Sequence, residues 1–171
     1  MGKPASEFQA VQIAVMTVSD RRDASNDISG DYLRSAAAEA GHSVVDHAIV
    51  PENLYRIRAT VSRWIASDDV QVVIVNGGTG FNLKNSTPEA LLPLFDREIE
   101  GFGELFRMIS YEEIGGSTLQ SRAIAGLANQ TLILAVPGST SACRTAWERI
   151  IADQIDARTA PCNFVSHLKK Q

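Results

Sequence analysis

VVIVNGGTG, at residues 72–80, joins a short apolar stretch to a glycine-rich loop. Four aliphatic residues in a row, ended by Asn-Gly, predict a strand that is buried on both faces. Strands of that kind belong to parallel sheets with helices on both sides. The glycines at 77, 78 and 80 allow positive φ and carry no Cβ atom, so a phosphate or a ring can approach the main chain. The stretch therefore predicts a parallel α/β sheet with a ligand-accessible loop at the end of a central strand.

The segments on either side of this stretch alternate between strand and helix patterns. Apolar runs predict further strands at 13–18, 43–50 and 132–136. Apolar residues at helical spacing predict one helix before Gly41, one from Leu54 to Ile65, and a terminal helix after Ser139. The pattern over 91–127 is mostly helical, and 158–171 is expected to be an extended tail. This order predicts a three-layer α/β fold, with a mainly parallel, doubly wound sheet and helices on both faces.

The length of the chain fits one domain comfortably. Its 171 residues are 44% hydrophobic and 21% charged, which is ordinary globular composition. We expect a flexible arm at 1–10, a single domain over 11–165 and a tail at 166–171. The two cysteines cannot build a disulfide framework, and together with the three histidines they show no zinc spacing.

Charge and hydropathy limit the classes of partner. Sixteen Lys and Arg against 20 Asp and Glu give a net charge of -4, which argues against a dedicated nucleic-acid binder. No stretch approaches the roughly 20 apolar residues that a membrane span needs. We therefore expect a cytosolic, cytoplasmic protein with no nucleic-acid and no membrane partner, acting on a small molecule or a protein.

Three loops are expected to meet at one edge of the sheet, because ligands of open parallel sheets bind outside the carboxyl ends of the strands. Their glycines, hydroxyls and carboxylates suit a phosphate-bearing ligand, and Asp20 and Asp27 are candidate ligands for Mg²⁺. The loops are Ser19-Asp20 with Asp27-Ile28-Ser29-Gly30, then Gly77-Gly78-Thr79-Gly80, then Pro137-Gly138-Ser139-Thr140.

Each of these motifs also has a purely structural interpretation. The glycine-rich loop matches neither G-x-G-x-x-G nor G-x-x-x-x-G-K-[ST], so a phosphate site and a plain turn both stay open. Asp27 and Ser29 are also candidate caps of the first helix, and Ser139 of the last. Trp64 and Cys143 lie at helical spacing among apolar neighbours, which favours core packing over a cofactor or nucleophile role.

Five motifs in this order resemble the MoaB/Mog family of molybdenum cofactor biosynthesis proteins. They are Thr17-Val18-Ser19-Asp20, Asp27-Ile28-Ser29-Gly30, Gly77-Gly78-Thr79-Gly80, Thr87-Pro88-Glu89 and Pro137-Gly138-Ser139. The similarity spans about residues 11–165, and the segments 89–97 and 137–140 resemble the MoaB branch in particular.

The resemblance implies a molybdopterin-binding α/β domain that forms a homo-trimer, or a hexamer of two trimers, and works beside other molybdenum cofactor enzymes. Active members of the family join molybdopterin to AMP from Mg-ATP. By carry-over, the pterin phosphate or nucleotide would be bound by Gly77, Gly78, Thr79, Gly80, Pro137, Gly138 and Ser139. The nucleotide side would be lined by Ser19, Asp20, Asp27, Ser29 and Gly30.

Two positions depart from the family's active pattern. Asn85 stands where the family has a catalytic Asp, and Glu52 where it tends to have Asp. An amide carries no charge and is a poor magnesium ligand, whereas Glu52 keeps the charge on a longer side chain. We expect a molybdopterin-binding protein whose adenylyl transfer is weakened or lost. In the alternative, an active Mg-ATP-dependent molybdopterin adenylyltransferase, the metal is held by Asp20, Asp27 or Glu52.

Two further questions stay open at the level of sequence. A flavodoxin-like mononucleotide binder is a third hypothesis, although the first loop lacks the Ser/Thr-rich phosphate-binding segment of that class. Apolar side chains near the middle of the chain could serve either the core or an assembly interface. They are Phe95, Phe102, Leu105, Phe106 and Met108.

Overall fold

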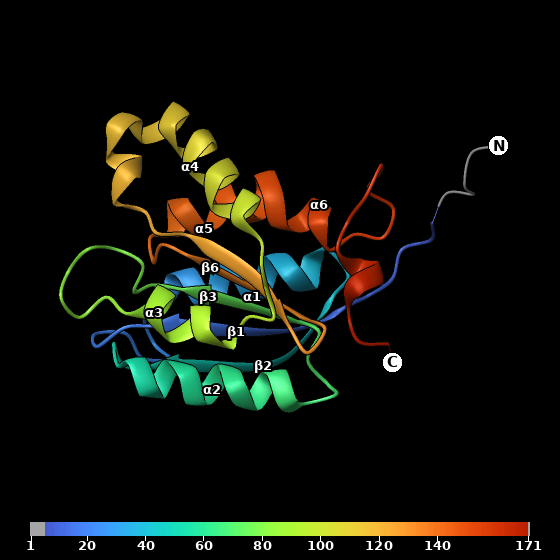
Figure 1. The fold of residues 1–171 in the computed structure, drawn as a ribbon, viewed down its shortest axis with the longest axis horizontal. Coiled ribbons are helices and arrows are strands. Elements are labelled where there is room, and N and C mark those ends of the chain that lie inside the picture. The colour runs from blue at the N-terminus through green and yellow to red at the C-terminus, as the bar shows by residue number, and fades with distance from the viewer. Residues whose placement is uncertain (1–5, 171) are drawn as a thin grey trace.

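A six-stranded sheet forms the middle layer of the protein. The computed structural model describes residues 6–170. The strands lie in the order β2-β1-β3-β6-β5-β4 (Figure 1). Four of them are parallel: β1 (Gln12–Val18), β2 (Ser43–Val50), β3 (Val72–Asn76) and β6 (Thr131–Val136). The edge pair β4 (Arg97–Glu98) and β5 (Ile124–Ala128) runs antiparallel. The predicted three-layer α/β fold with a mainly parallel sheet is confirmed.

Helices cover both faces of this sheet (Figure 1). One face carries α1 (Ile28–Glu39), α4 (Glu100–Ile114), α5 (Thr140–Ala146), a π-helical turn (Trp147–Ile151) and α6 (Ala152–Gln154). The other carries α2 (Leu54–Ala66) and α3 (Thr87–Leu91). Short 3-10 turns occupy Leu92–Leu94, Gly115–Gln120 and Val165–His167. Within residues 6–170, no helix is both long and apolar enough to cross a membrane.

The central strands are apolar on both faces because both faces are covered. In β1, Ile13 and Val15 pack under α1 while Ala14 and Met16 pack under α2, and all four are buried. Burying a side chain of this size stabilises a fold by about 1.5–3 kcal/mol, so two such layers account for the sheet's central position. Trp64 and Cys143 also lie in the core, as predicted.

The mostly helical pattern predicted for 91–127 is confirmed by α4 and the 3-10 turns on either side of it, but it is wrong at 97–98 and 124–127, where β4 and β5 lie. The sequence of β5, IAGLA, is rich in small residues and lacks the β-branched run that marks the other strands. It joins β6 through Asn129 and Gln130, both of positive φ, in a tight hairpin without the usual Asn-Gly pair. The local sequence of β5 therefore has too weak a preference for strand structure to predict it.

The extended tail predicted for 158–171 is also wrong in part. Val165–His167 form a 3-10 turn, and Leu168 is buried in the core. Lys169 donates its main-chain N–H to Gln130 O at 3.1 Å, and its Nζ to Ile65 O at 2.7 Å. Residues 1–5 of the predicted arm lie outside the described part, while 6–10 have no helix or strand. The flexible arm and the domain limits stay predictions.

Gly126→Ala tests the packing of the strand that sequence patterns missed. A Cβ atom at this position would overlap the ring of Phe95, so we expect the free energy of unfolding to fall by about 1–3 kcal/mol in urea denaturation. Gly116→Ala is the matched control, since a Cβ there meets nothing within 4 Å, and it should change stability by less than about 0.5 kcal/mol. Adding Phe95→Ala should make the Gly126→Ala cost smaller. Equal costs in both backgrounds would contradict the overlap.

Candidate functional site

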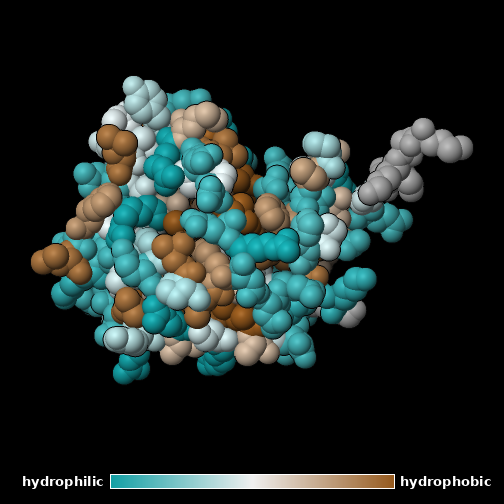
Figure 2. Space-filling view, in the orientation of Figure 1, coloured by the Kyte–Doolittle hydropathy of each residue, from teal (hydrophilic) through white to brown (hydrophobic). Residues whose placement is uncertain are grey.

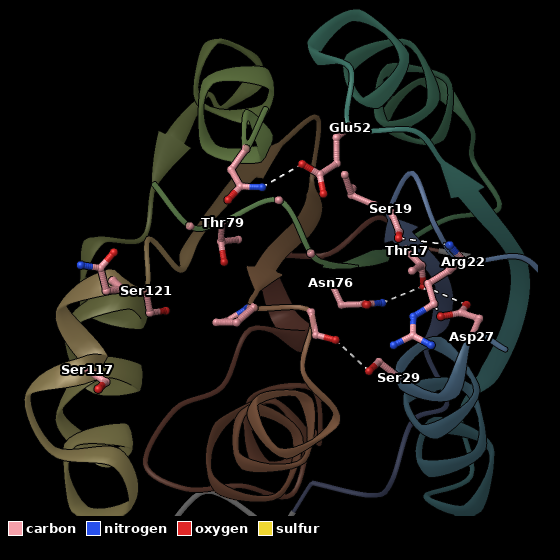
Figure 3. A pocket seen from close by; sticks show the side chains of 18 of the residues that line it. Thr17, Ser19, Arg22, Asp27, Ser29, Glu52, Asn76, Thr79, Ser117 and Ser121 are labelled. Atoms are coloured by element: carbon pink, nitrogen blue, oxygen red, sulfur yellow. Dashed lines mark hydrogen bonds between the residues drawn. The ribbon is translucent and has the colours of Figure 1, made fainter. Parts of the chain in front are cut away.

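A cavity of about 390 Å³, lined mainly by polar residues and glycines, opens at the carboxyl ends of β1, β3 and β6 (Figure 3). All three predicted loops contribute to its wall. The predicted residues that line it are Ser19, Asp27, Ser29, Glu52, Gly77, Gly78, Thr79, Gly80, Asn85, Pro137 and Gly138. Predicted residues that do not line it are Asp20, Gly30 and Ser139. The structure thus brings most of the sequence-derived set to one place.

The glycine-rich loop is shaped by crowding from neighbouring backbone. Gly77 and Gly78 have φ of 97° and 68°, and a Cβ at either would overlap Val18 O or Thr87 Oγ1. Glycine is therefore required here by the loop's own packing, besides any access it gives a ligand. Within residues 6–170, the main-chain N–H groups of Gly78, Thr79 and Gly80 donate to no protein group. A run of free N–H groups beside a cavity is suited to an anion.

Asp27 both caps α1 and forms part of the cavity wall. The residue is 5% exposed, and its carboxylate accepts from Gly30 N at 3.1 Å. Thr17 Oγ1 lies 2.9 Å from both carboxylate oxygens and itself accepts from Asn76 Nδ2 at 2.9 Å. This network joins the ends of β1 and β3 to the start of α1. The capping interpretation of Asp27 and its place in the cavity are therefore compatible.

Ser29 and Ser139, two of the three predicted serines, have different roles. Ser29 Oγ donates to Gly138 O at 2.9 Å and lies 3.0 Å from Thr140 Oγ1, so it joins α1 to the loop after β6. Ser139 caps α5 by accepting from Ala142 N at 3.2 Å. Helix capping is thus confirmed for Ser139, whereas Ser29 bonds across the cavity wall.

A second polar group surrounds Asn85 and Glu52, the two positions at which the resemblance implies a departure from the family's active pattern. Asn85 Nδ2 donates to Glu52 Oε2 at 2.8 Å. The main-chain N–H of Glu52 donates to Asp20 Oδ1 at 2.9 Å, and Lys84 Nζ donates to Asp20 Oδ2 at 3.0 Å. The Lys84 ammonium, followed by the Glu52 N–H, lowers the pKa of Asp20 below its ordinary value. Asp20 is thereby an exposed ion-pair partner at the edge of the site.

The carboxylates near the cavity are spread out. Among residues 6–170, no three His, Cys, Asp or Glu side chains lie close enough together to hold a metal ion. Asp20, Asp27 and Glu52 therefore do not form one three-carboxylate cluster, and their role as metal ligands stays a prediction. Burial raises the pKa of the Cys143 thiol to about 12, which suits a core residue and not a nucleophile.

Sequence reasoning missed one wall of the cavity entirely. Ser117 and Ser121 lie on or beside the turn after α4, across from Ser19 and Arg22 (Figure 3). The hydroxyl of Ser121 is buried and has no hydrogen-bond partner in the described part of the chain. No motif marks this segment, and only the fold brings it to the cavity. The full missed set is Thr17, Val18, Arg22, Asn76, Ile114, Ser117, Gln120 and Ser121.

Fold and cavity together define an α/β protein with a phosphate-compatible site at the carboxyl ends of parallel strands. The family described as "Probable molybdopterin binding domain" matches residues 14–157. Molybdenum cofactor biosynthesis protein B of Escherichia coli (strain K12) is 68% identical, covering 99% of this chain and 100% of that protein. The Bacillus cereus protein of the same name is 42% identical, with 85% and 86% covered. The chain belongs to the MoaB family of molybdenum cofactor biosynthesis proteins.

Solved structures agree with this family. A crystal structure of molybdenum cofactor biosynthesis protein B superimposes with a TM-score of 0.85 at 40% identity, covering 88% of this chain and 94% of that one. The tungsten cofactor synthesizing protein MoaB from Pyrococcus furiosus gives 0.75 at 33% identity, with 83% and 91% covered. The predicted resemblance is confirmed, and it supports the MoaB hypothesis over the flavodoxin-like one.

Lys84→Gln tests the ion pair at the edge of the site. Removing the ammonium should raise the pKa of Asp20 toward its ordinary value, as followed by NMR titration of the Asp20 carboxyl carbon. The pair stabilises the folded state above the unfolded-state pKa of about 3.9, and this contribution is lost as pH falls through the lower folded-state pKa. Lys84→Arg keeps the charge and is the control. An unchanged Asp20 titration in Lys84→Gln would show that Lys84 does not hold this carboxylate.

Proposed function

We propose that this protein binds molybdopterin in the cavity at the ends of β1, β3 and β6, as a step of molybdenum cofactor synthesis. The observation that carries the proposal is the run of unbonded N–H groups at Gly78, Thr79 and Gly80, which line that cavity. Such groups bind a phosphate through main-chain donors. The buried, unpaired hydroxyl of Ser121 on the far wall supports the same proposal, because a bound ligand would give it a partner.

The proposal extends to the chemistry that the family's active members perform. In adenylyl transfer, a terminal phosphate oxygen of molybdopterin forms a bond to the α-phosphorus of ATP, and pyrophosphate leaves. Such a transfer needs in-line positioning and neutralisation of phosphate charge, and Mg²⁺ supplies that charge when it is bound. The chain's own share would be to hold the acceptor phosphate at the glycine-rich loop and to place the nucleotide near Asp27 and Ser29.

Asn85 is the reason to propose binding with weakened or lost transfer. Its amide donates to Glu52, so one oxygen of the nearest carboxylate already has a partner. An amide oxygen without charge is a weaker ligand for Mg²⁺ than the family's Asp at this position. The alternative, an active adenylyltransferase, needs Asp20, Asp27 or Glu52 to hold the metal. Asp20 pairs with Lys84, Asp27 bonds with Thr17 and Gly30, and one Glu52 oxygen accepts from Asn85.

Calorimetric titration with molybdopterin, with and without Mg-ATP, tests this function. We expect molybdopterin to bind and no adenylylated product to form, whereas Asn85→Asp should gain magnesium-dependent product because it restores the carboxylate. Asn85→Ala is the control, since it removes the amide without adding a charge, and it should form no product. Absence of binding to the parent protein would overturn the proposed function. Product from the parent protein would instead favour the active adenylyltransferase.

We also propose that the protein works as a trimer, or as a hexamer of two trimers, in the cytosol beside other molybdenum cofactor enzymes. Phe102 and Phe106 are buried in the core, but Leu105 and Met108 on the same helix are 38% and 62% exposed. On the face of the molecule drawn in Figure 2, apolar side chains gather near the middle, below the position of α4. Exposed apolar groups of this size suit an interface between copies of a chain.

Light scattering on the purified protein tests the assembly. We expect a mass three or six times the 18.5 kDa of one chain. Met108→Glu should lower that mass, because it places a charge on the apolar face of α4. Tyr55→Glu, on the exposed side of α2, is the control and should leave the mass unchanged. A parent protein with the mass of a single chain would contradict the proposal.

A further inference from the structure

The charged groups that line the cavity are few and unbalanced. They are one guanidinium, that of Arg22, and two carboxylates, those of Asp27 and Glu52. A phosphate-bearing ligand therefore meets a wall with more negative than positive charge. Like charges in a partly enclosed site repel strongly, so the wall needs a cation to accept such a ligand. Arg22 is the side chain placed to provide it.

Arg22 is held in position by its own loop. Ser19 Oγ accepts from the main-chain N–H groups of Arg21 and Arg22 at 3.0 and 3.2 Å, which fixes the turn after β1. Arg22 Nη1 donates to Asn26 O at 3.1 Å. From this loop the side chain extends into the cavity toward Asp27 and Ser29 (Figure 3). The guanidinium is therefore oriented before any ligand binds.

Two other cations near the cavity, Lys84 and Arg122, are already engaged. Lys84 pairs with Asp20, and Arg122 pairs with Glu89 while also donating to Gly80 O and Asn85 O. Arg22, in contrast, makes no ion pair with any of the residues that the structure describes. A guanidinium has five N–H donors, and Arg22 uses one of them on Asn26. The remaining donors match the paired oxygens of a phosphate.

We propose that Arg22 is the residue by which this cavity selects a ligand that carries a phosphate over the same ligand without one. The inference rests on the proposed function and adds a specificity-determining residue to it. Two phosphates could meet Arg22, that of the pterin and that of the nucleotide. The chemistry is the same for both, and ligands that carry only one of them separate the two sources.

Arg22→Gln, measured by calorimetric titration, tests the proposal on two ligand pairs. The first pair is molybdopterin and its dephosphorylated form, and the second is AMP and adenosine. Losing a charged hydrogen bond to a phosphate should weaken binding of at least one phosphorylated ligand by about 10-fold to 100-fold. Binding of the ligands without phosphate should change by less than about twofold, because they make no contact with the lost charge.

Arg21→Gln is the matched control. It removes the same charge from the neighbouring residue, whose side chain does not line the cavity. It should leave all four affinities within about twofold of the parent. Arg22→Lys keeps the charge but not the paired donors, so it should recover part of the loss. Arg22→Gln and Arg22→Lys both remove the hydrogen bond from the guanidinium to Asn26 O. Partial recovery of binding in Arg22→Lys alone therefore indicates a phosphate contact and not a change in the structure of the loop.

The outcomes divide clearly. Weakening confined to molybdopterin assigns Arg22 to the pterin phosphate, and weakening confined to AMP assigns it to the nucleotide phosphate. Equal binding of phosphorylated ligands by the parent and Arg22→Gln overturns the inference while leaving the proposed function in place. Equal losses in Arg21→Gln and Arg22→Gln also overturn it, because general charge then explains the effect. A parent protein that binds no phosphorylated ligand defeats the proposed function, and the inference fails with it.

Discussion

Close backbone contact at Gly77 is the constraint on which the site depends. The ends of three parallel strands lie close together there. A Cβ at Gly77 would overlap Val18 O, and a Cβ at Gly138 would come within 3.1 Å of Gly77 Cα. Gly77 N also donates to Val136 O at 3.0 Å. The loops after β1, β3 and β6 therefore start close together and then separate, and the cavity lies between them. The cavity follows from this crowding, and so does the requirement for glycine.

The buried hydrogen-bond network of Asp27, Thr17 and Asn76 forms a polar part of the cavity wall. Asp27 is buried, and a buried carboxylate without hydrogen bonds would cost considerable free energy. Here Thr17 Oγ1 and Gly30 N supply those bonds. The same bonds hold the first turn of α1 against the ends of β1 and β3. Structural capping and site formation are therefore one arrangement, which explains why local sequence patterns could not separate the two roles of Asp27.

The parts of the molecule that sequence predicted are those governed by local pattern. Continuous apolar runs indicated β1, β3 and β6, and the rule that loops converge beyond parallel strands brought Asp27, Gly78 and Gly138 together. What escaped prediction depends on distant partners. The strand β5 is identifiable only by its pairing with β6. Ser121 joins the cavity because the segment after α4 returns to the glycine-rich loop, where Arg122 N donates to Thr79 O. Neither segment carries a local preference strong enough to reveal its position.

Charge balance connects the substitution at Asn85 to the proposed ligand. With Asp at this position, three carboxylates would line the cavity against one guanidinium, and a phosphate could approach only with a divalent cation to offset the repulsion. The Asn85 amide is neutral, so that wall carries one negative charge fewer than it would with Asp, and the amide also donates to Glu52. Under the proposed function, accommodation of an anionic ligand then depends on Arg22 and the free N–H groups of the glycine-rich loop. In the proposed function, the Asn85 amide that weakens metal-assisted transfer therefore also makes binding without a metal physically reasonable.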